Sequence, residues 1–355
     1  MQLPFGRSKS IVGLDIGSSS IKVVECVSRS KGVELVHLGR AQLPPEAIVQ
    51  GAFLNSSAIV ESIQEALGQA GTKASCVAAA VAGHAVIVKK ISLPEMTREE
   101  LEESIRWEAE QYIPFDINEV NLDFQILDGS ETEGQMDVLL VAAKKDLIDD
   151  YVHVITDAGL SPGVIDIAGF AVANAWSANY DTDPDDVVAL VNIGAQVVNI
   201  NILCGGVPAF TRDINTGGNA YTEEIQKALS VSWDEAERMK LGGSGDEDTQ
   251  EVVPEEVEQA MRSVTETLIG EISRSLDFFA ATAAESRISR VFLSGGGSKV
   301  SGLDAAFQGK TNLPVERMDP FARIAPSARL DAETLQELGP SLAVSVGLAL
   351  RRMDD

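Results

Sequence analysis

The fold is decided by two stretches of similar plan, IVGLDIGSSSIKVVE at Ile11–Glu25 and VALVNIGAQVVNINI at Val188–Ile202. Each runs as a β-branched strand, a polar residue, an apolar residue, a glycine, a short turn and a second strand. This pattern is typical of a hairpin whose glycine allows positive φ or a close approach. Asp15 matches Asn192 at an offset of 177 residues (192 − 15 = 177), half of the 355-residue chain, and the glycines two residues later match as well. The repeat predicts two homologous halves.

The segment between the two halves has a different pattern of predicted helices and strands. TREELEESIRWEAEQYIPF predicts a helix that begins in a capping box of Thr97 and Glu100 and stops at Pro114. Strands are expected at 85–93, 120–127 and 136–143, with a second helix at 146–158. The apolar stripe of the first helix is Leu101, Ile105, Ala109 and Tyr112. These elements predict a small α+β insert.

The second half continues with a glycine turn and helix at TGGNAYTEEI, a helix capped by Ser232, a long helix from Pro254, and a strand, glycine loop and helix at RVFLSGGGSKVSGLDAAF. The long helix is expected to carry an apolar face of Val257, Met261, Val264, Leu268, Ile272, Leu276 and Phe279. We therefore predict a first half at residues 8–84 and 163–185, the insert at 85–162, a second half at 186–340, and a C-terminal helix at 341–352 that packs back on the first half.

Composition narrows the function classes. The chain carries 28 Lys and Arg against 54 Asp and Glu, a net charge of −26, which disfavours direct binding to nucleic acid or anionic lipid. Its three cysteines lack the spacing of a disulfide framework or zinc site, which favours the cytoplasm. We also expect no targeting segment and no direct membrane insertion, because no run reaches about 18 uninterrupted apolar residues.

Two glycine-containing turns favour phosphate chemistry. In LDIGSSSIK, the Asp15 carboxylate, the backbone amides of a small-residue turn and the Lys22 ammonium suit Mg²⁺ and a polyphosphate. A plain hairpin with an exposed aspartate and lysine explains the same residues. Gly295–Gly297 can present amides and a helix N-terminus to a nucleotide, or form an ordinary tight turn. The chain has neither GxGxxG nor GxxxxGK[ST], which argues against Rossmann and Walker-type binding.

Taken in order, LDIGSSSIK, VNIGAQVVNI, TGGNAYTEEI, FLSGGGSKVSGL and SLAVSVGLAL resemble the nucleotide-binding signatures of the actin, Hsp70 and sugar-kinase superfamily. The resemblance implies an α/β, actin-like fold with ribonuclease H-like duplicated halves and ATP or ADP, with Mg²⁺, between them. The small α+β insert looks like that of the cell-division protein FtsA, and IRWEAEQYIPFDINEVNLDFQIL is similar to the PilM family of type IV pilus biogenesis proteins.

The resemblance also implies site residues. A first phosphate loop corresponds to Asp15, Gly17, Ser18, Ser19 and Lys22, a second loop to Asn192 and Gly194, a turn near the sugar to Gly217 and Gly218, and an adenosine loop to Gly295, Gly296, Gly297 and Ser298. Asp15 would hold Mg²⁺ through water. Glu271, Arg274 and Ser275 would flank the purine, although a solvated Glu–Arg pair explains the first two equally well.

One departure concerns turnover. Superfamily hydrolases usually carry Asp where this chain has Asn192, and an asparagine adds no charge opposite the metal. The resemblance therefore implies binding with slow or absent hydrolysis. An Asn192→Asp variant is expected to keep binding intact or to raise hydrolysis. Gln196 is expected to be a polar turn residue and not a catalytic one.

The resemblance implies a cytoplasmic ATP-binding scaffold of the type IV pilus platform, peripheral to the inner membrane through the N-terminal tail of a single-pass PilN-like protein. The tail would dock between the insert and the first half, with Trp107 and Tyr112 as candidate contacts, since Trp107 lies off its helix's apolar stripe. Packing of Trp107 against the insert's own sheet explains that position at least as well. Other platform proteins, the motor ATPases and a ring or other self-assembly are further expected partners. The alternatives are an ATPase, a small-molecule kinase or an FtsA-like filament.

Overall fold

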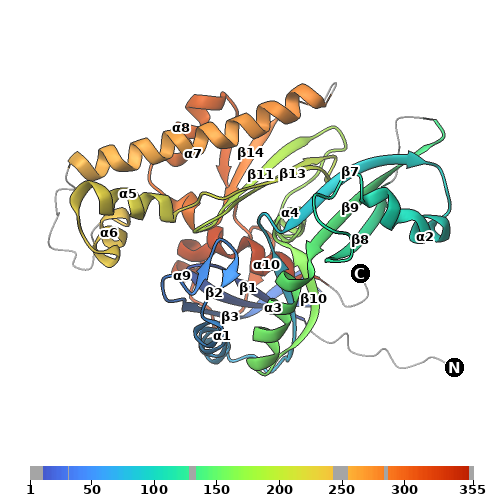
Figure 1. Cartoon of the computed structure of the whole chain (residues 1–355). Helices are drawn as coiled ribbons and strands as arrows, with labels where there is room; N and C mark the ends of the chain where they lie inside the picture. The colour runs from blue at the N-terminus through green and yellow to red at the C-terminus, as the bar shows by residue number, and fades with distance from the viewer. Residues whose placement is uncertain (1–10, 31, 128–132, 243–254, 284–286, 352–355) are drawn as a thin grey trace.

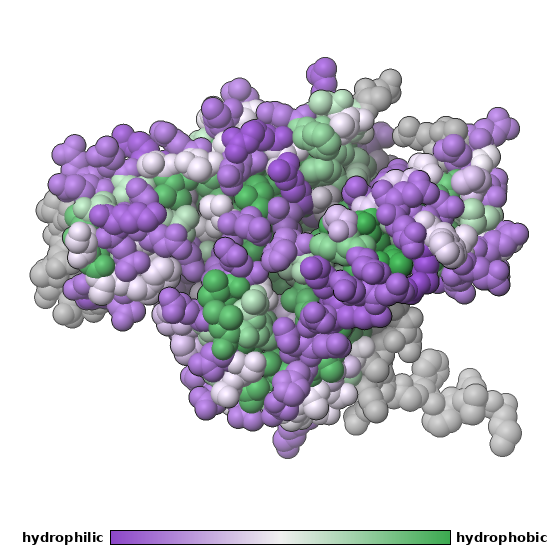
Figure 2. Space-filling model, viewed as in Figure 1, coloured by the Kyte–Doolittle hydropathy of each residue, from purple (hydrophilic) through white to green (hydrophobic). Residues whose placement is uncertain are grey.

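The computed structural model describes residues 11–30, 32–127, 133–242, 255–283 and 287–351. It contains two halves, each built on a sheet, and a smaller insert beside them (Figure 1). Of the predicted ranges, residues 8–10, 31, 128–132, 243–254, 284–286 and 352 lie outside the described residues, and so does Pro254, the expected start of the long helix. On the face shown in Figure 2, hydrophilic residues predominate and hydrophobic residues reach the surface in separate patches, as expected for a net charge of −26.

The first half is built on a six-stranded sheet. In spatial order its strands are β10 (Ser161–Ile167), β6 (Cys76–Val81), β1 (Val12–Ile16), β2 (Ser20–Arg29), β3 (Gly32–Gln42) and β16 (Ala325–Pro326). One face packs against α1 (Ser56–Ala70) and α3 (Lys145–Asp157), and the other against α4 (Ala168–Asn179) and α10 (Ala343–Ala349). β4 (Ile48–Val49) and β5 (Ala52–Phe53) form a separate short hairpin. The predicted first hairpin is confirmed, because β1 and β2 pair antiparallel across the turn.

The helix α10 lies directly on the strand that carries Asp15. A Cβ atom at Gly13 of β1 would collide with the Ser345 carbonyl oxygen, and one at Gly347 of α10 would collide with the Ala171 carbonyl oxygen. Glycine at these two positions therefore lets α10 approach both β1 and α4 at backbone contact distance.

The second half is built on a five-stranded sheet. In spatial order its strands are β13 (Val207–Ile214), β12 (Val198–Cys204), β11 (Val187–Ile193), β14 (Arg290–Ser294) and β15 (Val315–Arg317). Its helices are α5 (Asn219–Leu229), α6 (Trp233–Lys240), α7 (Glu255–Thr282) and α8 (Leu303–Thr311), with the 3-10 turn η1 (Gly296–Lys299) after β14. The predicted apolar face of α7 is confirmed, since Leu268, Ile272, Leu276 and Phe279 are buried in one core with β11 and β14. α9 (Ala332–Leu338) and η2 (Gly339–Leu342) lead to α10.

The insert is a three-stranded sheet in the order β7 (Val86–Pro94), β9 (Gln135–Lys144), β8 (Val120–Leu127), covered by α2 (Arg98–Ala109). The predicted capping box is present, with Thr97 accepting from the Glu100 amide and Glu100 accepting from the Thr97 amide. α2 ends at Ala109, before the expected stop at Pro114. The edge strand β7 lies against β13 of the second half.

Two elements join the first half from outside its predicted range. The helix expected to complete the insert, α3, buries Tyr151, Val154 and Ile155 in the core of the first half, together with α1. An amphipathic pattern shows that a helix has a buried face but not which sheet it covers. β16, from within the range 186–340, pairs with β3 of the first sheet.

Candidate functional site

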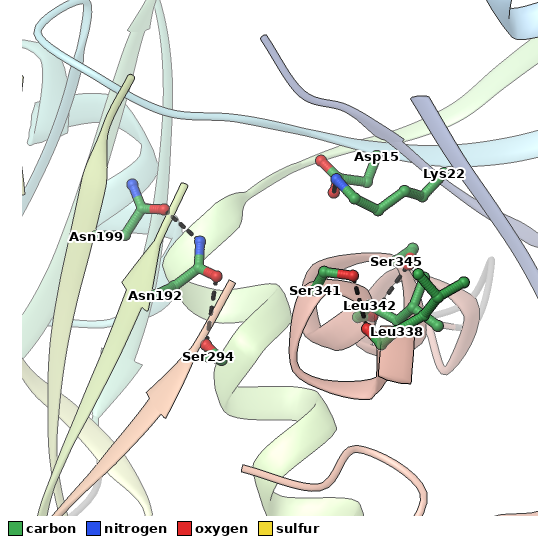
Figure 3. Close-up of polar contacts among 9 residues, drawn as sticks. All are labelled: Asp15, Lys22, Asn192, Asn199, Ser294, Leu338, Ser341, Leu342 and Ser345. Atoms are coloured by element: carbon green, nitrogen blue, oxygen red, sulfur yellow. Dashed lines mark hydrogen bonds and ion pairs between the residues drawn. The ribbon is translucent and has the colours of Figure 1, made fainter. Parts of the chain in front are cut away.

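Each half places one polar pair across its hairpin, just before the turn. Asp15 lies opposite Lys22 in the β1–β2 register, and Asn192 lies opposite Asn199 in the β11–β12 register. The first pair is an ion pair with Lys22 Nζ 2.9 Å from Asp15 Oδ2. In the second pair, Asn192 Nδ2 donates to Asn199 Oδ1 at 2.9 Å. The repeat therefore extends to Lys22 and Asn199, and Figure 3 shows the two pairs on separate hairpins, with the heads of Asp15 and Lys22 directed toward the side on which Asn192 lies.

The first turn combines the charged pair with open backbone. The Gly17 N–H donates to the Ser20 carbonyl oxygen at 3.3 Å, and a Cβ atom at Gly17 would lie 3.3 Å from Lys22 Nζ. Glycine thus leaves room for the lysine head beside the turn. Ser18 is half-buried and Ser19 is exposed. The site offers an ammonium for phosphate and a carboxylate for a hydrated cation.

In the second half, Asn192 belongs to a buried chain of hydrogen bonds. Ser294 Oγ donates to Asn192 Oδ1 at 3.3 Å, and Asn199 Nδ2 donates to Asp213 Oδ1 at 2.8 Å. The backbone N–H of Gly83 donates to the other carboxylate oxygen of Asp213. Burial raises the pKa of Asp213 above its usual range, while the hydrogen bonds from Asn199 and Gly83 act against this shift. Sequence reasoning missed Asp213, because no local pattern marks it.

The glycine loops of the second half come together by backbone contacts. The Gly218 N–H donates to the Gly194 carbonyl oxygen at 2.8 Å, and the Asn219 N–H donates to the Ala195 carbonyl oxygen at 2.8 Å. A Cβ atom at Gly217 would lie 2.5 Å from the Gly194 carbonyl oxygen, so only glycine fits there. Gly295, at φ +83°, packs its Cα against Asn192, whose Oδ1 would lie 2.8 Å from a Cβ atom.

The third glycine loop holds Gly295, Gly296, Gly297 and Ser298. The Gly295 N–H donates to the Pro340 carbonyl oxygen at 2.7 Å, and Ser298 Oγ donates to the Gly295 carbonyl oxygen at 2.7 Å. A Cβ atom at Gly297 would collide with Ile193, whereas one at Gly296 would meet no atom within 4 Å. Gly296 therefore faces open space, and the loop is a cradle of bare backbone.

Lys240 is a second residue that sequence reasoning missed. Its Nζ lies 2.6 Å from Glu237 Oε2, 3.0 Å from Thr222 Oγ1 and 3.5 Å from the Gly218 carbonyl oxygen. The Lys240 side chain is only 11% exposed, so α6 delivers a shielded cation directly behind the Gly217–Gly218 turn. The signal available in the sequence was a Glu and Lys three residues apart on the helix that Ser232 caps.

Gln196 connects the two halves. Its Nε2 donates to the Ile48 carbonyl oxygen at 2.8 Å, and its Oε1 accepts from the Gln50 N–H at 3.0 Å. The turn of the second hairpin is thereby fastened to the β4–β5 hairpin of the first half, across 148 positions of sequence. The expected polar turn residue is in fact a contact between the halves.

Comparison with known proteins identifies the family. The family model described as type IV pilus assembly protein PilM matches residues 13–353. The chain belongs to this family. A solved PilM–PilN type IV pilus biogenesis complex contains a chain with 32% identity and a TM-score of 0.86, covering 97% of this chain and 99% of that one. The actin-like, FtsA-related fold that the sequence predicted for this PilM-family chain is confirmed.

More distant relatives share the fold. The cell division protein FtsA of Escherichia coli (strain K12) is 24% identical over 257 residues, which cover 66% of this chain and 60% of FtsA. The chain thus spans less than two thirds of that relative's length. MreB5 of Spiroplasma citri, solved with AMPPNP bound, has 12% identity and a TM-score of 0.51 over 96% of this chain and 95% of that one, and so shares the fold.

Not all predicted site residues of this PilM-family chain lie in the loops. On α7, Arg274 lies 3.8 Å from Glu271, and the buried Ser275 donates to the Glu271 carbonyl oxygen. Trp107 on α2 is 74% exposed, whereas Tyr112 packs against the core of the insert. α2 lies at the outer end of the insert, away from β1 and β2 (Figure 1).

Two further properties bear on the site. Among the residues that the structure describes, no cluster of three His, Cys, Asp or Glu side chains is arranged to hold a metal ion. Asp15 is therefore a single carboxylate, which suits a cation that keeps most of its water and phosphate ligands. No helix in the described part of this PilM-family chain has the length and apolar character needed to span a bilayer.

Proposed function

We propose that this PilM-family protein binds ATP or ADP between its two halves and acts as a nucleotide-dependent scaffold of the type IV pilus platform, holding the N-terminal tail of a PilN-like inner-membrane protein. The observation that carries the nucleotide part is the arrangement of an ammonium–carboxylate pair on one hairpin and three interlocked glycine loops on the other half.

The site fits a nucleotide because the glycine loops of the second half leave backbone groups uncovered and the β1–β2 hairpin supplies charged groups. Asp15, Gly17, Ser18, Ser19 and Lys22 would hold the phosphates and, through water, Mg²⁺, which would supply the positive charge that phosphates need in so acidic a protein. Asn192, Gly194, Gly217 and Gly218 would meet the phosphates and sugar from the second half. Gly295, Gly296, Gly297 and Ser298 would line the nucleoside, with Glu271, Arg274 and Ser275 proposed beside the purine.

Lys240 and Glu237 join this proposed set on geometric grounds. Lys240 lies behind Gly218 and is held there by Thr222 and Glu237, so its charge stabilises an anion or hydroxyl that approaches the turn. The two halves would then contribute one lysine each, Lys22 and Lys240.

We further propose that turnover is slow. Asn192 carries no charge, and both ends of its amide are engaged by Asn199 and Ser294. A side chain fixed in this way is poorly placed to activate a water molecule. Nucleotide occupancy, rather than hydrolysis, would then favour one arrangement of halves and insert through its differential affinity.

The proposed tail site lies between the insert and the first half. A PilN-like partner is supported by the solved PilM–PilN complex, whose matching chain is 32% identical and covers 97% of this chain. Because α2 lies at the outer end of the insert (Figure 1), the tail would extend from this site along the insert to reach Trp107, which we propose as an aromatic anchor, with Tyr112 stabilising the turn behind it. The protein would be cytoplasmic and peripheral to the inner membrane through this partner, with other platform proteins, motor ATPases and a ring or other self-assembly as further candidates.

The test uses the full chain and a synthetic peptide with the cytoplasmic N-terminal sequence of the PilN encoded in the same genome. Peptide affinity is measured by fluorescence anisotropy without nucleotide, with Mg–ATP and with Mg–ADP, and nucleotide affinity by calorimetry. We expect Mg–ATP to bind and to change peptide affinity. If the peptide binds in none of these states, the proposed PilN-like partner is refuted. If no nucleotide binds, the proposed nucleotide site is refuted. Trp107→Ala, with Gln111→Ala as its exposed neighbour control, tests the anchor.

A further inference from the structure

The buried polar chain of the second half has a fixed direction. A carboxylate only accepts hydrogen bonds, so Asp213 requires Asn199 to present its NH₂ group. The carbonyl oxygen of Asn199 must then face Asn192, which in turn presents its own NH₂ group. Asn192 is left with its carbonyl oxygen directed at Ser294 and the Gly295 loop. The orientation of the Asn192 amide is thus set two strands away, on β13.

The other oxygen of Asp213 reaches the joint between the first half and the insert. It accepts from the N–H of Gly83, which lies between the end of β6 and the start of β7 and has φ +94°. The Gly83 carbonyl oxygen accepts from the Val86 N–H at 3.0 Å, which closes the turn into β7. β7 also lies against β13, the strand of Asp213. One carboxylate therefore contacts both the polar chain and the first turn of the insert.

Burial gives this chain its rigidity. Ser294, Asn192 and Asn199 are each at most 8% exposed, so water cannot replace a lost partner. A buried donor that faces another donor is unfavourable, and the chain can relieve such a conflict only by turning every amide in sequence. The hydrogen-bond chain has two arrangements in which each amide group has a partner, and the charge on Asp213 selects one of them.

We infer that Asp213 is a positioning residue that orients the Asn192 amide toward the nucleotide loops and ties that orientation to the start of the insert at Gly83, so that the nucleotide site and the insert change together. This inference rests on the proposed nucleotide and tail sites for its functional consequence. The orientation itself does not depend on either ligand.

The first test is Asp213→Asn, which keeps size and removes charge. Its carbonyl oxygen can accept from Gly83, and its NH₂ group then opposes that of Asn199. The expected result is inversion of both asparagine amides, with Asn192 donating to Ser294. In ¹⁵N-resolved NMR of the nucleotide-free full chain, the Gly83 amide and the Asn192 side-chain amide should both shift, whereas Asp277→Asn, at an exposed position on α7, should shift neither. A shift at Gly83 without one at Asn192 would overturn the inference.

The second test reverses the direction of the hydrogen bonds that Asn199 makes. Asn192→Asp alone places a carboxylate oxygen against Asn199 Oδ1, which Asp213 holds in place, so the melting temperature should fall by several degrees. In the double variant Asn192→Asp with Asp213→Asn, the bonds from residue 199 to residues 192 and 213 can both form in the opposite direction, while Ser294 and Gly83 donate as before. Most of that loss should therefore be recovered. Asn121→Asp, exposed on β8, controls for added charge. If Asn192→Asp lowers the melting temperature equally in wild type and in Asp213→Asn, the proposed hydrogen-bond chain is contradicted.

The functional consequence is measured last. Wild-type protein should show a nucleotide-dependent change in affinity for the PilN-type peptide, and in Asp213→Asn this ratio should fall toward 1 while the peptide still binds. An unchanged ratio refutes the coupling. If wild type shows no nucleotide effect, the proposed function fails, and the NMR and melting measurements still decide the positioning role of Asp213.

Discussion

The two hairpins place different chemistry at the same register. Across β1 and β2 the paired residues are Asp15 and Lys22, which are both half-buried. Across β11 and β12 they are Asn192 and Asn199, which are 8% and 6% exposed and carry no charge. Both polar contacts measure 2.9 Å. The backbone plan is shared, and the side chains and their accessibility are not.

The difference separates two tasks. An ion pair with accessible ends can exchange partners, so Lys22 can turn to a phosphate and Asp15 to a hydrated cation without leaving a buried charge unpaired. The asparagine pair cannot exchange partners so easily, because Ser294 and Asp213 engage its outer ends in the protein interior. The first hairpin is suited to bind and release a ligand, and the second to report its presence to neighbouring strands.

The largest expected effect comes from breaking the charged pair. Asp15→Ala removes the carboxylate proposed to hold Mg²⁺ through water, and we expect Mg–ATP affinity to fall by about 100-fold or more, close to 2.8 kcal/mol at about 1.4 kcal/mol per factor of ten. Calorimetric titration measures this. Asp277→Ala, exposed on α7, should bind as wild type does. Unchanged affinity in Asp15→Ala would contradict the assignment of this hairpin.

A smaller effect is expected from the cation of the second half. Lys240→Met removes the ammonium behind Gly218 and leaves Glu237 and Thr222 without it, and we expect nucleotide affinity to fall by about tenfold, or ~1.4 kcal/mol. The control is Lys227→Met, because Lys227 forms a similar pair with Glu224 on α5 that is exposed to solvent. An exposed pair of this kind contributes little. Equal losses in both variants would indicate a general charge effect and not a site at Lys240.

Much of the fold could be predicted because its signals are local. The hairpins, the capping box at Thr97 and the apolar face of α7 each depend on residues that lie close together in the sequence. Lys22 and Asn199 are also equivalent positions at the offset of 177, and the sequence alone contains this match. The helical stripe placed Trp107 off the apolar face of its helix, but only the structure shows that the side chain is exposed and not packed on the sheet of the insert.

The rest could not be predicted, because it depends on contacts between distant segments. Asp213 meets Gly83 across 130 positions of sequence, and no periodicity connects them. α3 has a clear apolar face, yet only the tertiary structure shows that it covers the first sheet and not the insert. The expected tolerance of Asn192→Asp changes for the same reason. From sequence the new carboxylate gains a charge opposite a metal, but in the fold it opposes an oxygen of Asn199 that Asp213 holds in place.

The smallest expected effect concerns the contact that fastens the turn of the β11–β12 hairpin to the β4–β5 hairpin of the first half. Gln196→Ala removes both hydrogen bonds to the backbone of Ile48 and Gln50 without touching either polar pair. These bonds lie near the surface, where each contributes about 0.5–1.5 kcal/mol and water replaces part of it. We expect nucleotide affinity to fall by about threefold, ~0.7 kcal/mol, with faster release in stopped-flow measurements because the halves open more readily. Gln111→Ala, at an exposed position of the insert, should change neither quantity. If Gln196→Ala instead lowered affinity as much as Asp15→Ala does, closure of the halves would outweigh the charged pair, and the division of tasks between the two hairpins would be wrong.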